Sequence, residues 1–504
     1  MKYIIVLCIG ILSSQDNKTA TFEESNGTAG SVGTVTINGQ VYNQLSLRPE
    51  IPLGKLVIGL DLYLYFNDDG IYWESWDFSG LEPAYRTIID KIYYLRWGNP
   101  SDDFYFLAGA LPSVTLGHGI LVNNYSNIME YPQVRQIGLD LQANVSGVDI
   151  EVIHSNLKSA SPGLLGLRGS YSIRPKLNLG LSFVMDMNQL AALSDSDGDD
   201  YPDLYDYYPD DSEIWDDSLK WRNTYENMMV NENPDYVFNE VLFQNWYENS
   251  DYYYDYNPIT AKSDGISSVA LDVSYSLTDK ITLYSQYALL IGEIDTTMLD
   301  PTIHLTETKL GSGYVPIGVR AKLGPVKLMG EFRIGSERFV FNYWDKAYDV
   351  NRVSIVDSKI VTRESQLYQY GNLSGVYAYA NMSVMNYVKL GMGYQNMQGE
   401  KWDEESERYE SGESNQTFIT TIGINSSLIP KIGKAEAFYR QSNVPNPFKF
   451  SPSTSTIWGY NIGVEVSSGV MLLYKARTTY ISDLLNPGEF KPVKSLQIET
   501  QFVI

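Results

Sequence analysis

Five aspartates in one acidic segment have the spacing of ligands for a hard cation. Asp195, Asp197, Asp199, Asp203 and Asp206 occupy positions 1, 3, 5, 9 and 12 of the run from 195 to 206. Calcium takes about six to eight oxygen ligands, and carboxylates at alternate positions of a tight loop can converge on one ion. The spacing predicts a Ca²⁺ site, with a solvated acidic loop as the alternative.

This run resembles the calcium-binding repeats of the thrombospondin type 3 kind, and its spacing is similar to that of an EF-hand loop. It departs from the EF-hand because Gly198 stands at position 4 instead of 6, and because the run ends in Asp206 instead of glutamate. The departures argue against flanking EF-hand helices. The resemblance implies one bound Ca²⁺ in a bacterial surface protein.

The acidic run lies in the longest interruption of the strand pattern, residues 189–262. Clustered carboxylates repel one another unless cations bridge them, so we expect a long extracellular loop that is folded around calcium. Its aromatic residues could stack on sugar rings or pack within the loop. They include Trp215, Trp221, Trp246 and Tyr252, Tyr253 and Tyr254.

Two other segments could carry chemistry. Residues 112–134, which include Leu116-Gly117-His118-Gly119, interrupt the strand pattern without being strongly polar. They fit either a constriction folded into a cavity or an ordinary external loop. The triplet His154-Ser155-Asn156 resembles the residues used by outer-membrane phospholipases, but its local pattern differs by one residue. We therefore expect no enzymatic activity.

Composition limits the class of protein. The 504 residues include 37 Lys and Arg against 61 Asp and Glu, a formal net charge of −24. This balance argues against a nucleic-acid partner, because phosphate binding needs clustered basic residues. The 40 tyrosines suit a membrane interface, where the ring lies in lipid and the hydroxyl in water.

The N-terminal segment indicates export. Residues 1–15 have the composition of a cleaved signal peptide, with an apolar run from Tyr3 to Leu12. That run is shorter than the roughly 20 apolar residues of a membrane-spanning helix. Cys8, the single cysteine, lies within it, so the mature chain should have none. We expect residues 16–33, rich in Gly, Ser, Thr and Asn, to form a flexible periplasmic lead-in or a small plug.

Alternation of apolar and polar residues with period two recurs across residues 34–504. Residues 165–174 read LGLRGSYSIR, with an apolar and a polar face. Tight turns, separated by long polar loops, are predicted at Ile51-Pro52, Asn99-Pro100, Ser146-Gly147, Pro175-Lys176, Thr278-Asp279, Gly324-Pro325, Met385-Asn386, Pro430-Lys431 and Ser468-Gly469. Alternating short and long connections are typical of transmembrane barrels. We expect an all-β fold, a single antiparallel barrel of about 18 strands within a range of 16–20.

The pattern resembles bacterial outer-membrane porin-like barrels, including an amphipathic C-terminal strand of Leu496, Ile498, Thr500, Phe502 and Ile504. Barrels of this kind usually end on an aromatic residue that the barrel assembly machinery recognises, whereas this chain ends on Ile504. The resemblance implies a location in the bacterial outer membrane and contact with its lipid and with that machinery.

Charged residues within the strands favour a barrel over a soluble sandwich, because in a barrel they line the lumen while apolar faces meet lipid. The predicted pore-lining residues are Asp61, Asp140, Arg168, Arg174, Asp272, Arg320, Lys322, Lys327, Glu331, Arg333, Glu436, Arg440, Lys475 and Arg477. Their mixed charge predicts a porin-like channel for passive diffusion of small polar solutes or ions.

A protein of another class would give the same pattern. In that alternative, the barrel anchors the calcium-stabilised loop, and the surface loops bind glycan or protein in adhesion. A long-chain fatty acid transporter fits less well, because its lumen should be more apolar than these strands provide.

Overall fold

The computed structural model describes residues 29–37, 40–68, 70–129, 136–158, 163–193, 208, 218–234, 236–249, 265–294, 303–356, 359–384, 387–412, 414–425, 431–453, 455–467, 470–482 and 490–503. The chain divides into two units, one formed by residues 187–265 and the other by the rest. No helix among these described residues is long and apolar enough to cross a membrane.

The larger unit contains a single sheet of 24 strands, each paired antiparallel with its neighbours. Its N-terminal strands are β1 (Ala29–Ile37), β2 (Gln40–Arg48), β3 (Glu50–Leu53), β4 (Leu56–Leu60), β5 (Leu62–Asn67), β6 (Gly70–Ile71), β7 (Ile92–Trp97) and β8 (Phe104–Gly109). A helix, α1 (Leu81–Asp90), and a short 3₁₀ turn, η1 (Trp73–Trp76), lie between β6 and β7.

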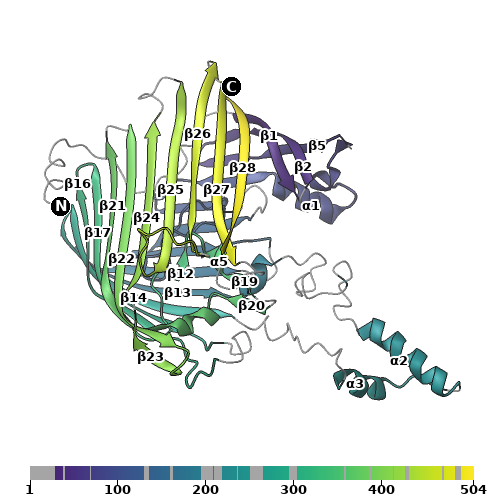
Figure 1. Ribbon diagram of the computed structural model, residues 1–504. Helices are drawn as coiled ribbons and strands as arrows, with labels where there is room; N and C mark the ends of the chain where they lie inside the picture. The colour runs from purple at the N-terminus through teal and green to yellow at the C-terminus, as the bar shows by residue number, and fades with distance from the viewer. Residues whose placement is uncertain are drawn as a thin grey trace. The chain divides into compact units, whose positions relative to one another are not determined.

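The remaining strands follow in chain order (Figure 1). The middle strands are β10 (Gly138–Val145), β11 (Val148–His154), β12 (Leu164–Arg174), β13 (Leu177–Asp186), β14 (Ile266–Thr278), β15 (Ile281–Ile291), β16 (Ser312–Leu323) and β17 (Val326–Gly335). The last strands are β21 (Tyr370–Val384), β22 (Val388–Asp403), β23 (Arg408–Ser411), β24 (Asn415–Asn425), β25 (Ile432–Val444), β26 (Ile457–Ser467), β27 (Val470–Ser482) and β28 (Phe490–Val503).

From β3 onward, short connections lie at one end of the strands and long ones at the other; β1 and β2 also meet closely, with Ile37 opposite Gln40, at the other end. Strand pairs meet at eight of the nine predicted turns, as between Arg174 and Leu177 or between Leu323 and Val326. The first turn is displaced: Leu53 pairs with Leu56, so the chain reverses at Gly54 and Lys55 instead of at Ile51-Pro52. Gly54 has a φ of +70°, which glycine adopts without steric cost.

The two ends of the chain's strand order are hydrogen bonded to each other. β1 pairs with β2 over its whole length, and its residues 29–33 also pair with β28. The expected lead-in of residues 16–33 is therefore too long, because the strand begins at Ala29. Residues 16–28 and the predicted signal peptide lie outside the described residues.

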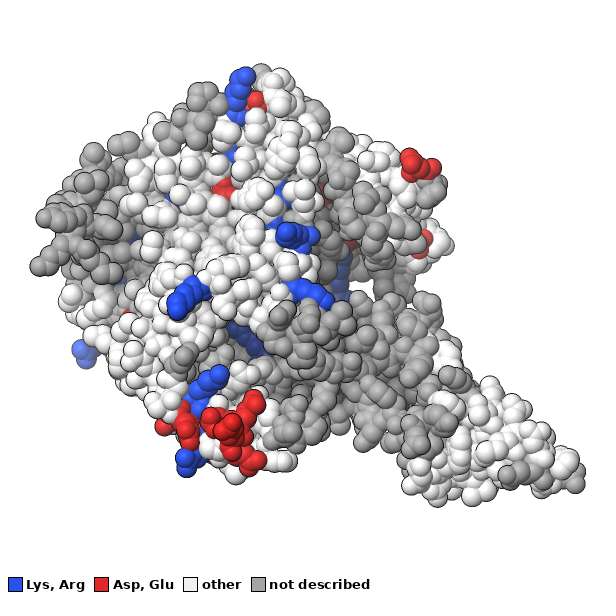
Figure 2. All heavy atoms as spheres, viewed as in Figure 1, with Lys and Arg blue, Asp and Glu red and all other residues white. Residues whose placement is uncertain are grey.

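The sheet has an exposed apolar face and a buried polar face. On β14, Leu271, Val273 and Tyr275 are 55, 37 and 45% exposed, whereas Asp272 and Ser274 are each only 8% exposed. In a soluble sandwich the apolar faces are buried and the outward faces are wet. Figure 2 shows the outer face over β24–β28 as mostly uncharged, with acidic side chains gathered below it, near the β22–β23 hairpin.

A hydrophobic core lies on the polar side of the sheet. Much of it comes from two connections instead of from strands: residues 111–125 between β8 and β10, and residues 339–348 between β17 and β21. Tyr125, Tyr343 and Trp344 are each at most 1% exposed. Part of the sheet's inner face is therefore covered by the protein's own loops.

The smaller unit is partly helical, which the strand pattern did not predict. It contains η2 (Gln189–Ala192), α2 (Ser218–Glu232) and α3 (Glu240–Glu248). The Asn239 side chain caps α3 by accepting a hydrogen bond from the Leu242 N–H at 3.2 Å. Tyr225, Phe243 and Tyr247 are buried between the helices and form an aromatic core.

Several inner-face glycines lie beneath an aromatic ring of a neighbouring strand. Gly318 on β16 pairs with Tyr284 on β15, and a Cβ at Gly318 would lie 2.3 Å from the tyrosine ring. A methyl group there must displace the ring. Gly330, on the outer face of β17, provides a contrast, because a Cβ there would have no atom within 4 Å.

We expect Gly318→Ala to reduce the free energy of unfolding by about 1–3 kcal/mol, the typical cost of overpacking. Gly330→Ala should change it by no more than about 0.5 kcal/mol. Urea titration of the refolded protein in detergent, followed by tryptophan fluorescence, measures both. Equal effects of the two substitutions would show that the ring does not pack on Gly318 as described.

Candidate functional site in the interior of the sheet

The connection between β8 and β10 folds onto the polar face of the sheet. Its ends are fixed by Asn127, whose Oδ1 accepts a hydrogen bond from the Leu111 N–H at 2.7 Å and whose Nδ2 donates to the Ser155 carbonyl at 2.9 Å. Val122 and Tyr125 within it are almost completely buried. Of the two interpretations of residues 112–134, the structure therefore confirms the inward fold for the described part, up to Met129.

The tip of this connection lies on charged residues of the sheet. The His118 ring stacks on Tyr284, with centroids 4.1 Å apart and planes inclined by 7°. Arg320 on β16 donates to the His118 carbonyl at 3.0 Å. Burial, together with the positive charge of Arg320, lowers the pKa of His118 to about 3, so the imidazole is neutral at physiological pH.

Gly117 is required by the close approach of this tip to the sheet. Its φ is +58°, and a Cβ would lie 2.6 Å from the Arg168 guanidinium. Arg168 binds Asp272 through both of its terminal nitrogens and donates to Ser182 at 3.1 Å. The loop tip thus covers a buried ion pair that joins β12 and β14.

A second buried network continues across the next strands. The Tyr284 hydroxyl donates to Glu331 at 2.7 Å, and the Arg333 Nε donates to the same carboxylate at 2.7 Å. Arg333 also donates to Gln395 on β22. These contacts place mixed charge on the inner face from β15 to β22.

The connection between β17 and β21 also lies inside and pairs with the first. It contains β18 (Trp344–Asp345), α5 (Tyr348–Asn351), β19 (Val353–Val356), β20 (Lys359–Thr362) and η4 (Ser365–Gln369). β18 runs parallel to β9 (Val122–Asn123) of the first connection. Asn342 donates through its backbone to Ile120 at 2.9 Å and through its side chain to Gly119. The two interior loops therefore form one structure.

Carboxylates fix this second loop to two parts of the sheet. Asp186, at the end of β13, is completely buried and accepts hydrogen bonds from the Tyr348 hydroxyl at 2.7 Å and from Arg352 at 3.4 Å. The Tyr125 hydroxyl donates to Asp349 at 2.7 Å, which ties the two loops together. These partners are needed because an unpaired buried charge is costly.

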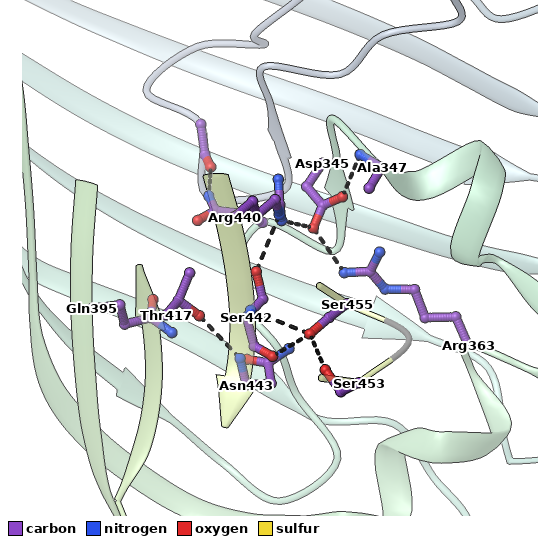
Figure 3. Close-up of polar contacts among 12 residues, drawn as sticks. Asp345, Ala347, Arg363, Gln395, Thr417, Arg440, Ser442, Asn443, Ser453 and Ser455 are labelled. Atoms are coloured by element: carbon purple, nitrogen blue, oxygen red, sulfur yellow. Dashed lines mark hydrogen bonds and ion pairs between the residues drawn. The ribbon is translucent and has the colours of Figure 1, made fainter. Parts of the chain in front are cut away.

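Asp345 makes the contact with the opposite part of the sheet. It binds Arg363 at 3.1 Å and also binds Arg440 on β25, and it accepts the Ala347 N–H at 2.9 Å (Figure 3). Burial alone would raise the pKa of Asp345, but the two guanidinium groups lower it below its usual value. The carboxylate therefore stays charged and holds the loop to β25.

The strand pairing places most of the predicted pore-lining residues on the inner face. Asp140, Arg168, Asp272, Glu331 and Arg333 are buried there, and Asp61 is buried against Arg48 at 3.1 Å. The others lie on the same face by register and are partly exposed: Arg320, Lys322, Lys327, Glu436, Arg440, Lys475 and Arg477.

The prediction for Arg174 is wrong. The pairing of β12 with β13 shifts register between Ser172 and Arg174, so Arg174 lies opposite Leu177. Leu177 in turn pairs with Tyr275, which belongs to the exposed apolar face. A one-residue shift moves a side chain to the other face of a strand, so Arg174 lies outside.

The residues that anchor the second loop were not predicted. Asp345, Asp349, Arg352 and Arg363 lie in a connection without period-two alternation, and nothing in their spacing marks them. Tyr125, Asp186 and Arg440, the partners of Asp349, Arg352 and Asp345, are between 95 and 224 positions away in sequence. Only the folded sheet brings such distant residues together.

The calcium motif cannot be placed, because residues 195–206 lie outside the described residues. Trp221 and Trp246, which could have stacked on sugars, pack on the aromatic core of the smaller unit instead; the Trp246 and Tyr225 centroids are 5.1 Å apart. Trp215 and Tyr252–Tyr254 also lie outside the described residues.

No protein-family profile and no curated protein matches this chain. Among solved structures, OccK11 (OpdR) of Pseudomonas aeruginosa is 9% identical, with 94% of each chain covered and a TM-score of 0.30. Wzi of Escherichia coli, described as a carbohydrate-binding β-barrel of capsule assembly, is 8% identical, with 95% of this chain and 84% of Wzi covered and a TM-score of 0.31. A Rh. blastica porin mutant is 7% identical, covers 73% of this chain and 89% of its own, and has a TM-score of 0.27. Identities below 10% and TM-scores near 0.3 establish no family for this chain.

The shifted pKa of Asp349 predicts that the stability of the protein depends on pH. Burial raises the pKa of its carboxyl from 3.8 to about 6, although the charge of Arg352 opposes the shift. The folded state therefore binds the proton more tightly than the unfolded state does. The stabilising contribution of this group is complete below pH 3.8 and is lost as the pH rises through about 6.

We expect Asp349→Asn, which is uncharged at every pH, to remove this dependence. Relative to the variant, the wild type should lose about 1–3 kcal/mol of unfolding free energy between pH 4 and pH 7. Urea titrations at the two pH values measure this, with the exposed Asp68→Asn as control. A difference between wild type and Asp349→Asn that does not change with pH would contradict the assignment.

Proposed function

We propose that this chain is a bacterial outer-membrane β-barrel that carries small polar solutes or ions past its two interior loops. The observation that best supports this proposal is the distribution of side chains between the two faces of the sheet. The outer face is apolar and exposed, and the inner face carries buried charges. In lipid, an apolar outer surface is stable and polar side chains are confined to the interior. In water, the same surface would cost solubility.

The strand pairings support a closed barrel of 20 strands. Within the 24-stranded sheet, β2 with β3 and β4 with β5 are single runs interrupted at Pro49 and Asp61, and β6 and β23 are short hairpin arms. Twenty strands remain, and β1 joins β28 to β2. This even number falls at the upper limit of the expected range. Closure leaves no free edge, as a sheet in a membrane requires.

The interior loops affect the expected width of the channel. The first interior loop contacts β15 and β16, and the second is bound to β13 and β25. Anchored in this way, the two loops narrow the space that the strands surround. We therefore infer a restricted passage instead of a wide pore. Its charged inner face favours small polar solutes over lipids.

Single-channel recording in a planar bilayer tests the channel directly. We expect small ohmic steps from the wild type, and steps several-fold larger when residues 113–126 are replaced by a short Gly-Ser linker. The control replaces Glu404–Glu407, at the tip of the β22–β23 hairpin, with Asn-Gly and should leave conductance unchanged. If neither the wild type nor the linker variant conducts, the channel function is wrong and a surface-binding role is favoured.

A second candidate function is surface binding by residues 187–265, and it is favoured because this segment forms a separate compact unit with an aromatic core. We propose that Ca²⁺ bound by Asp195, Asp197, Asp199, Asp203 and Asp206 stabilises that unit. Binding of glycan or protein by this unit would make the barrel its anchor.

Limited proteolysis of the full chain tests the calcium site. Calcium sites of extracellular modules typically have dissociation constants of about 0.1–1 mM. We therefore expect 1 mM Ca²⁺ to slow proteolytic cleavage within residues 187–265. The variant Asp197→Asn/Asp199→Asn should be cleaved equally fast with and without Ca²⁺. Protection by Mg²⁺ to the same extent, or protection that persists in the variant, would contradict a specific calcium site.

A further inference from the structure

The inner face of the sheet has charges of opposite sign in different sectors. From β10 to β14, the inner-face charges of the described residues are five carboxylates and one arginine: Asp140, Asp149, Glu151, Asp186, Asp272 and Arg168. From β16 to β27, basic side chains predominate. They are Arg320, Lys322, Lys327, Arg333, Lys389, Lys434, Arg440, Lys475 and Arg477, with Glu331, Glu436 and Glu465 as the carboxylates.

The interior loops cover part of the acidic sector, where two carboxylates already bind cations of the protein, whereas Asp149 is exposed and Glu151 is partly exposed. Asp272 binds Arg168, and Asp186 binds Arg352. Asp186 is completely buried and Asp272 is 8% exposed. A dissolved cation therefore has little access to these carboxylates.

The basic sector is more accessible. Arg320, Lys322, Lys327 and Lys389 are partly exposed, and so are Lys475 and Arg477. The Lys434 side chain is 29% exposed even though it lies 3.6 Å from Glu436. A solute on the inner side of the sheet therefore meets mainly positive charge.

Like charges are placed close together in this sector. Lys322 and Lys327 are directly opposite each other on β16 and β17, and both are partly exposed. They therefore place two positive charges at one position on the inner face.

A second concentration of positive charge lies where the interior loop meets β25 and β27. Lys346, next to Asp345 in the loop, lies over Phe438, with its Nζ 6.0 Å from the ring centroid. Phe438 pairs with Gly459, which pairs with Arg477, and Lys475 lies two residues before Arg477 on the same face.

The electrostatics of Lys346 also reflect its basic neighbours. Burial lowers the pKa of Lys346, and the charges of Arg440 and Arg477 lower it further, whereas the charge of Glu436 raises it. We call Lys346, Lys434, Arg440, Lys475 and Arg477 the basic cluster.

We propose that the basic cluster and the Lys322–Lys327 pair make the passage selective for small oxyanions, namely carboxylates and phosphates. Lysine and arginine donate charge-assisted hydrogen bonds to such groups, and accessible, partly covered charges attract ions more strongly than those in bulk water. The inference rests on the proposed channel and names its class of solute. It holds despite the chain's net charge of −24, because the selectivity depends on the inner face alone.

The test measures reversal potentials of single channels under gradients of potassium chloride, potassium acetate and potassium phosphate. For the wild type we expect anions to permeate better than K⁺ in each salt. The variant Lys475→Gln/Arg477→Gln should lower the anion-to-cation permeability ratio by about twofold or more, because two inner-face charges are removed. A larger decrease in acetate or in phosphate tells which oxyanion the cluster prefers.

The control Lys449→Gln/Lys494→Gln removes the same charge from exposed positions, in the 445–453 segment and on the outer face opposite Thr478. It should leave the ratio unchanged. If the first variant does not fold, Lys346→Gln in the interior loop gives the same comparison. Channels that prefer K⁺, or a ratio that the cluster variants do not lower, would overturn the anion inference only. Absence of any channel in the wild type would overturn the proposed function.

Discussion

The rest of this structure depends on one constraint. Charges buried on one face of the sheet need partners, while the other face of the sheet is apolar. The inner face carries arginines and carboxylates in strand after strand, and each needs a partner because an isolated buried charge is costly. Neighbouring strands supply part of the answer, as in the contact of Arg168 with Asp272 across β12–β14. The rest comes from connections that fold inward.

The two interior loops together provide partners for these buried charges. The first covers Arg168 with a glycine turn and stacks His118 on Tyr284. The second reaches Asp186 on one side and Arg440 on the other. Since β9 and β18 pair and Tyr125 binds Asp349, neither loop can move far without disturbing the other. In the channel that we propose, a passage bounded by such anchored loops should have a fixed width and fixed charges, which suits selection among small solutes.

The same arrangement separates the charges by sector. The loops occupy the acidic side, where Arg352 of the second loop binds Asp186 and the first loop covers the ion pair of Asp272 with Arg168 of β12. They also bring Lys346 to the basic side. Positive charge is thus left accessible on the strands from β16 to β27. The acidic residues responsible for the net charge lie largely elsewhere, as in the 195–210 segment and at the β22–β23 hairpin, so net charge is a poor guide to what the interior attracts.

The sequence by itself determined the strands, their turns and the face on which most charged residues lie. These depend on local alternation and turn chemistry, which act over a few residues. It also indicated that residues 112–134 are unusual, although it could not choose between an inward and an outward fold. The tertiary structure decided that choice, the pairing of the strands and the helices of the smaller unit. It also moved Arg174 to the outer face through a bulge and brought Asp345, Asp349 and Arg352 to partners far away in the chain. Such pairings depend on which strands become neighbours, and that is decided only when the whole sheet forms, because a side chain's position along its own strand does not specify what lies across the interior.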